Sequence, residues 1–170
     1  LENAGLYDEA EPLLRLTVGV TRKKMGDNHP TTLAFMNNLA LLYESQGIFD
    51  KAEPLYNQAI ESAAESLGEE HPDTIAFINN LAYLALLQND YNKASPLFEK
   101  VLKSWVKTLG ESHQKTLKGM NNLARVRHHQ GRLDEAEKLF IKALDLRTKL
   151  LGAKHMDVLR SMHDLGALYR

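Results

Sequence analysis

Seven histidines are the side chains of this 170-residue chain whose type and spacing most readily suggest chemistry. Four of them, His29, His71, His113 and His155, recur at intervals of 42 residues. An imidazole can transfer a proton or ligate a metal, but the ligands of one zinc ion lie about 2 Å from it. Equivalent positions in stacked repeats lie on the order of 10 Å apart. We therefore predict that these four are turn histidines, each packing or hydrogen-bonding near the start of a helix.

The remaining reactive residues do not form a catalytic pattern. His128 and His129 are neighbours on a predicted helix and point about 100° apart, unlike an i, i+4 ligand pair, so a metal site there would need His163. The chain has no cysteine, and it lacks a nucleophile elbow, a phosphate-binding glycine loop and a zinc-protease motif. Carboxylates such as Asp134 and Glu135 fall in early helical turns, where they complement the helix N-terminus. We expect no enzymatic activity, no metal and no cofactor.

The composition is that of an ordinary globular domain. Hydrophobic residues make up 44% of the chain and charged residues 25%, with a formal net charge of −1. A chain so close to neutrality lacks the cationic surplus of a nucleic-acid-binding protein. The longest apolar run, residues 81–87, is far shorter than a membrane span. The absence of cysteine favours a reducing, cytoplasmic location. Because the chain begins at Leu1, we expect it to be a piece of a larger protein.

Three sequence registers repeat with the same period of 42 residues. The motif around the turn histidines occurs at 26–32, 68–74 and 110–116, and more loosely at 152–158. The motif Asn-Asn-Leu-Ala occurs at 37–40, 79–82 and 121–124 and decays at 163–166. The third register consists of Ala10, Ala52, Ala94 and Ala136. The predicted organisation is a single array with a partial repeat 1–25, full repeats 26–67, 68–109 and 110–151, and a partial repeat 152–170.

Each period predicts two amphipathic helices. Apolar residues recur at helical spacing, and no segment shows sustained alternation with a period of two. The predicted pairs are 30–46 with 50–67, 72–88 with 91–108, and 114–130 with 133–150. The fold class is therefore all-α, built from stacked antiparallel helix pairs. The small residues of the alanine register allow helix axes to approach closely.

The two ends of the array are expected to lack a partner helix. Leu1 is predicted to lie late in the first helix of one period, and Arg170 late in that of another. We expect Leu13 and Leu14 to expose apolar surface at one end, and Leu165 and Leu168 at the other. Such surface favours a homodimer through the terminal helices or a continuation of the array in the full protein.

Seven residues of the first full copy carry a resemblance to a known family. In the order of the chain they are Asn38, Leu39, Ala40, Tyr43, Gly47, Ala52 and Ala59. Their spacing resembles the tetratricopeptide repeat (TPR), and the 42-residue period is similar to the long variant of kinesin light chains. The resemblance implies an α-solenoid, the TPR superhelix. The third copy departs from the pattern, with Gln114 in place of proline, Arg127 in place of tyrosine and Lys138 in place of the second-helix proline.

In the family that this chain resembles, the first helices line a concave groove that binds peptides. Carried onto this sequence, the resemblance implies the peptide-binding residues Asn37, Asn38, Leu41, Asn79, Asn80, Tyr83, Leu87, Lys118, Asn121, Asn122, Arg125 and His129. Three of the asparagines, one per copy, can hold an extended peptide backbone as a ladder of amides. The alternative is that one asparagine of each pair caps or braces the neighbouring helix.

The implied groove changes character along its length. Helix 114–130 carries Lys115, Lys118, Arg125 and Arg127 and no acid, whereas Tyr83 and residues 86–87 make the middle copy apolar. An apolar pocket beside a cationic stretch suits an acidic peptide with one large apolar anchor, as in cargo-adaptor or scaffold proteins. The basic helix could equally be a solvated face, and one of the two leucines at 86–87 could turn inward.

Two other functions remain open on sequence grounds. The array could be a structural spacer or self-assembly element that works through its ends. It could also be the sensor array of a larger multidomain protein with a nucleotide-hydrolysing unit. RNA binding through helix 114–130 is poorly supported, because the implied groove lacks a run of aromatic residues. We expect a protein or peptide partner, and no nucleic acid or membrane.

Overall fold

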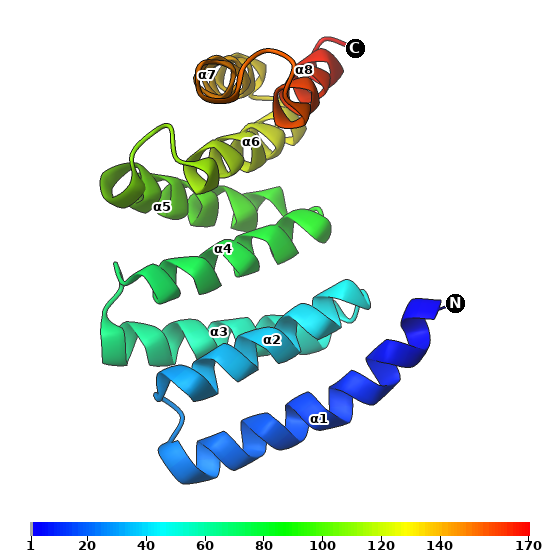
Figure 1. Ribbon diagram of the computed structural model, residues 1–170, viewed down its shortest axis with the longest axis vertical. Helices are drawn as coiled ribbons and strands as arrows, with labels where there is room; N and C mark the ends of the chain where they lie inside the picture. The colour runs from blue at the N-terminus through cyan, green and yellow to red at the C-terminus, as the bar shows by residue number, and fades with distance from the viewer. Residues whose placement is uncertain (1) are drawn as a thin grey trace. The chain divides into compact units, whose positions relative to one another are not determined.

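The computed structural model describes residues 2–170, with the side chains of residues 2–6 and 8 excepted. The described residues form eight α-helices and no strand (Figure 1). The helices are α1 (Glu2–Met25), α2 (Pro30–Ser45), α3 (Phe49–Leu67), α4 (Pro72–Leu87), α5 (Tyr91–Leu109), α6 (Gln114–His129), α7 (Leu133–Leu151) and α8 (Met156–Leu168). None of these helices is both long and apolar enough to cross a membrane.

The helix ends follow from turn residues in each repeat. Gly47 and Gly131, directly after the first helices of their copies, have φ angles of 74° and 75°. A left-handed residue at this position ends a helix. In the second copy Asn89 takes the same role with φ 59°, since asparagine tolerates this conformation better than other side chains. The paired helices predicted from the sequence are confirmed, with bounds that differ by one residue at most.

The beginning of the chain differs from the prediction. Leu1 lies outside the described residues, so its assignment to a first helix stays a prediction. Residues 2–5 do not form the end of a separate helix but continue directly into α1, which runs for 24 residues.

Two compact units divide the chain, Leu1–Leu84 and Ala85–Arg170. In the first unit α2 packs against α1 on one side and α3 on the other. Met36 and Ala40 of α2, and Ala52, Tyr56 and Ala59 of α3, are completely buried. The small residues therefore lie where the sequence pattern placed the helix crossings. The division of the chain into repeats at 26, 68, 110 and 152 remains a prediction.

In the second unit α6 packs between α5 and α7, and α7 packs against α8. One core cluster joins Leu117 and Met120 of α6 to Ala143 of α7. A second cluster consists of Ala124, Ala136 and Phe140, and Leu165 and Leu168 of α8 pack against it. These two leucines are half-buried rather than exposed, because they lie on the side of α8 that faces this cluster. The exposed apolar residues of α8 are others, as described below.

Candidate functional site

The four periodic histidines each accept a hydrogen bond at the start of a helix. The Nδ1 atoms of His29 and His71 accept from the backbone N–H two residues on, both at 3.2 Å. Those of His113 and His155 accept in the same way at 3.1 Å. Each imidazole thus satisfies one backbone donor that the first turn of a helix leaves free. The prediction of turn histidines is confirmed, and no cluster of three or more potential metal ligands occurs among the described residues.

The adjacent histidines of α6 form part of a ring stack. The rings of Tyr91 and His129 are parallel within 7°, with centroids 4.6 Å apart, and those of His128 and His129 are 5.5 Å apart. Desolvation, and then the positive charges of His128 and Arg125, lower the pKa of His129. His163 on α8, which a metal site at this place would also need, lies 3.8 Å from the carboxylate of Asp164. Stacking on Tyr91 orients His129 for contact with another ring rather than for chelation.

In the first unit the asparagines connect α2 with α4. The side-chain amide of Asn80 donates a hydrogen bond to Oδ1 of Asn37 at 2.8 Å, and Asn79 lies 3.5 Å from Oδ1 of Asn80. Asn38 and Leu41 are exposed beside this contact. The bond joins two neighbouring repeats through polar side chains that are half-buried.

In the second unit the equivalent contact connects α6 with α8. Asn121 donates to the carboxylate of Asp164 at 3.3 Å, again across 43 residues, and both Asn121 and Asn122 are buried. Each contact therefore joins the first asparagine position of one copy to the second position of the next. This is the bracing role that the sequence left open as an alternative. Asn121 and Asn122 therefore offer little surface to a ligand, and a contact of the asparagines with a peptide stays a prediction.

The basic face of α6 is smaller than the sequence indicated. Lys118, Arg125 and His129 are exposed, and their spacing of seven and four residues places them on one side of the helix. Neither Lys118 nor Arg125 takes part in an ion pair among the described residues. Arg127 does not belong to this face, because it is 5% exposed and lies between α5 and α7. In the apolar part, Leu86 is buried and Leu87 is 40% exposed, so one leucine does turn inward. Tyr83 is half-buried.

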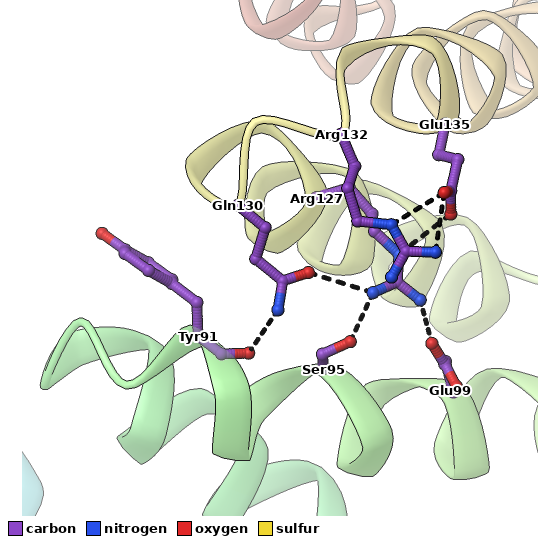
Figure 2. A network of polar contacts seen from close by, with 7 residues as sticks. All are labelled: Tyr91, Ser95, Glu99, Arg127, Gln130, Arg132 and Glu135. Carbon is purple, nitrogen blue, oxygen red and sulfur yellow. Dashed lines mark hydrogen bonds and ion pairs between the residues drawn. The ribbon is translucent and has the colours of Figure 1, made fainter.

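Arg127 forms a polar network that the sequence reading missed (Figure 2). Its guanidinium donates to Ser95 at 2.5 Å, to the carboxylate of Glu99 and to Gln130 at 3.0 Å. Its Nε lies 3.3 Å from Glu135, which also binds Arg132. Desolvation lowers the pKa of Arg127. The guanidinium therefore ties α5, α6 and the start of α7 together, and its charge is not available to a ligand.

A recurring pair of positions 32 residues apart could have indicated this network from the sequence, because Arg127 and Ser95 occupy such a pair. Tyr43 occupies the repeat position of Arg127, and its hydroxyl donates to Glu11 at 2.8 Å. That hydrogen bond lowers the pKa of the Glu11 carboxyl, whereas burial and the same bond raise the pKa of Tyr43. In the fourth copy Tyr169 donates to Glu137 in the same way. Both members differ in the pair formed by Arg127 of the third copy and Ser95 of the second: arginine replaces the tyrosine and serine replaces the glutamate.

Comparison with known proteins decides the family. The tetratricopeptide repeat family model matches residues 1–65, 36–105 and 115–170. The chain belongs to the tetratricopeptide repeat family. A crystal structure of a putative kinesin light chain with nearly identical TPR-like repeats from Podosopora anserina is 30% identical. The match has a TM-score of 0.86 and covers 98% of this chain and 79% of that one.

Two further structures share the TPR fold at lower identity. BtubC (BKLC) from P. vanneervenii is 24% identical with a TM-score of 0.87, over 99% of this chain and 67% of that one. The N-terminal domain of stress-induced protein-1 from C. elegans is 18% identical with a TM-score of 0.58, over 81% of this chain and 94% of that one. No protein with a curated description matches the chain. The predicted fold class, an all-α TPR α-solenoid of the kinesin light chain-like variant, is confirmed.

Proposed function

We propose that this TPR protein binds a short acidic peptide segment of a partner protein through the exposed face of α6. TPR repeats are in general modules for protein–protein interaction. The proposal adds the charge of the ligand and its location, and it assigns no catalytic role. The chain has no cysteine, in keeping with the cytoplasmic location that we also propose.

The observation that carries the proposal is a pair of uncompensated cations on one helix face. Lys118 and Arg125 are exposed seven residues apart, without an ion pair among the described residues, and His129 follows one turn later. Two other exposed lysines of this unit are paired, Lys142 with Glu111 at 2.6 Å and Lys149 with Asp145 at 2.7 Å. Unpaired charges on one face attract and orient a ligand of opposite charge without first having to break an internal contact.

An apolar anchor in the ligand is the second part of the proposal. Leu87, at the end of α4, is 40% exposed, and the ring of Tyr91 stacks on His129 at the end of α6. Both belong to the unit that carries the basic face. A large apolar or aromatic side chain gains affinity by covering such surface, and one anchor residue commonly dominates short-motif binding. Affinities of such contacts are near micromolar, about −8 kcal/mol.

The test begins with a peptide display screen against the folded chain, followed by fluorescence anisotropy with the selected peptides. Each peptide is paired with a version in which Asp and Glu are replaced by Asn and Gln. We expect the acidic versions to bind at least about tenfold more tightly, a difference of about 1.4 kcal/mol. Salt above roughly 0.15 M should reduce this preference because it screens the exposed charges.

Charge reversal locates the binding face. Lys118→Glu with Arg125→Glu should weaken binding of acidic peptides about tenfold or more and flatten the salt dependence. The matched control, Lys103→Glu with Lys138→Glu, changes the net charge equally at exposed positions on α5 and α7. Equal losses in both double variants would show that net charge alone attracts the peptide. No loss in the first variant for any acidic peptide would refute the proposed site.

A further inference from the structure

The helix α8 exposes an apolar stripe that is buried in the other copies. Leu159 and Met162 lie one turn apart and are 46% and 45% exposed. One period earlier, the equivalents of Leu159 and Met162 are Leu117 and Met120, which are 1% and 2% exposed. The stripe thus has the composition of a core but is in contact with solvent.

The second unit shows what covers the equivalent stripe on α6. Leu117 and Met120 contact Ala143, and Leu139 and Leu146 of the same helix, α7, pack against this cluster. In this copy the stripe of the first helix is therefore covered by Leu139, Ala143 and Leu146 of the second helix, together with Leu102 of α5. Those three residues lie at i, i+4 and i+7 on one face of α7.

In the helix α1 the outer two of these positions carry exposed apolar residues, and the middle one carries a half-buried threonine. The repeat equivalents of Leu139, Ala143 and Leu146 in α1 are Leu13, Thr17 and Val20. Leu13 is 64% exposed and Val20 is 42% exposed, while the other side of α1 packs on α2 through Val18 and Thr21. The two halves of the α6–α7 interface therefore occur again in this chain, one on α8 and the other on α1, and both are open to solvent.

We propose that two copies of this chain associate head to tail, with α8 of one copy packing on α1 of the other as α6 packs on α7. The occupant of the α8 stripe is thus a second copy, because α1 carries the residues at the required repeat positions. Such an interface is heterologous: each copy uses a different surface, and each dimer keeps one open surface of each kind. Apolar surface of this extent on an ordinary monomer marks an interaction site.

Blocking one surface at a time tests the arrangement. In the first variant, Leu159→Glu with Met162→Glu removes the α8 surface, and in the second, Leu13→Glu with Val20→Glu removes the α1 surface. By light scattering over a concentration series, the unmodified chain should reach masses above a dimer, and each variant alone should stay monomeric. An equal mixture of the two should form a dimer and nothing larger. The control Ile141→Glu with Leu150→Glu, at exposed sites on α7, should behave as the unmodified chain.

Several results would overturn the proposal. Dimers of the second variant alone would indicate a symmetric α8–α8 contact, and dimers of the first variant alone an α1–α1 contact. A monomeric mixture, at concentrations where the unmodified chain associates, would exclude α8–α1 pairing, as would an unmodified chain that is monomeric throughout. A covalent measurement does not depend on the glutamate variants folding. Because the chain has no cysteine, Thr17→Cys mixed with Met162→Cys should give a mixed disulfide dimer, whereas Thr17→Cys mixed with Ile141→Cys should not.

Discussion

At the residue scale, one repeat position carries different chemistry in different copies while its partner changes with it. Tyr43 binds Glu11, whereas Arg127 at the same position binds Ser95 and, one turn on from the serine, Glu99. A guanidinium has five donors in a planar fork and can engage several acceptors at once. A phenol donates one hydrogen bond. The third copy therefore needs more acceptors around this position than the first, and it has them.

We predict that restoring the tyrosine–glutamate pair partly repairs the loss of Arg127. Arg127→Tyr alone removes the cation between Glu99 and Glu135 and should lower the free energy of unfolding by about 2 kcal/mol. Adding Ser95→Glu should recover at least about half of this loss, because the phenol can then donate to a carboxylate. Arg127→Phe with Ser95→Glu is the control without a donor and should recover nothing. Urea unfolding followed by circular dichroism measures all three; equal recovery by tyrosine and phenylalanine would contradict the pairing.

A second prediction concerns Glu44, a half-buried carboxyl of α2 that accepts a hydrogen bond from the hydroxyl of the fully buried Tyr56 at 2.9 Å. Burial raises the pKa of Glu44, and the hydrogen bond from Tyr56 only partly opposes this. A carboxyl whose pKa is higher in the folded state binds more protons there than in the unfolded chain. The stability that it contributes is thus fully present below the unfolded pKa and is lost as the pH rises through the folded pKa.

Glu44→Gln should therefore be more stable than the unmodified protein at pH 7, and the difference should vanish near pH 4. The glutamine carbonyl can still accept from Tyr56, so only the charge is removed. Tyr56→Phe should instead cost about 1 kcal/mol at pH 7, since it takes a donor away from a half-buried carboxylate. Urea unfolding at pH 4, 5.5 and 7 distinguishes the two effects. A glutamine variant whose loss of stability relative to the unmodified protein grows from pH 4 to pH 7 would show that Glu44 is stabilised as the anion.

At the element scale, the large and the small residue of one helix crossing occupy opposite helices in different repeats. Trp105 of α5 packs on Gly119 of α6, where an added Cβ would meet the indole at 3.2 Å. One period earlier the equivalent pair is Ala63 of α3 and Phe77 of α4. There the large residue lies on the first helix of the next repeat instead of on the second helix. In the next copy Arg147 donates to Ser161, a third solution with a polar contact. Close packing allows only one large side chain at such a crossing.

The exchange predicts strong coupling between positions 105 and 119. Gly119→Phe alone overfills the crossing and should cost about 2 kcal/mol. Trp105→Ala alone leaves a cavity and should cost about 3 kcal/mol. The double variant copies the pair of the second repeat and should cost at least about 1 kcal/mol less than the sum. Guanidinium unfolding of all four proteins gives this coupling energy. Simple additivity would mean that the two residues do not share one space in solution.

The helices could be predicted well from the sequence because the residues that begin and end them recur in the copies. The same 42-residue period applies to the four turn histidines, the glycines after the helices and the alanines at the crossings. A helix boundary that is ambiguous in one copy can therefore be placed from the others. Arg127 was misplaced for the converse reason. A cation on a basic helix is expected to be exposed, and only the 32-residue partner position, with Ser95 and Glu99, shows that it is buried. Which asparagine braces its neighbour depended on the register of α2 with α4, which a single helix pattern does not contain.

At the scale of the whole molecule, the chain is nearly neutral, and the proposed association of its apolar α1 and α8 surfaces does not require charge complementarity. The formal net charge is −1 with neutral histidines, and the calculated isoelectric point is about 6.7. Copies therefore repel one another little at neutral pH, and contact between apolar stripes meets a small electrostatic barrier.

The self-association of the chain should accordingly be strongest near pH 6.7, the isoelectric point, and weaker at pH 5, where the chain is net positive and the copies repel one another. Adding salt at pH 5 should restore much of the association, because screening removes repulsion while leaving apolar contact intact. Sedimentation velocity at both pH values, in about 0.05 M and 0.5 M salt, measures the mass distribution, and the variant with Leu159→Glu and Met162→Glu provides the monomeric reference. If about 0.5 M salt dissociates the copies at pH 6.7, the interface is held by ion pairs. The apolar stripes of α1 and α8 would then not form its centre.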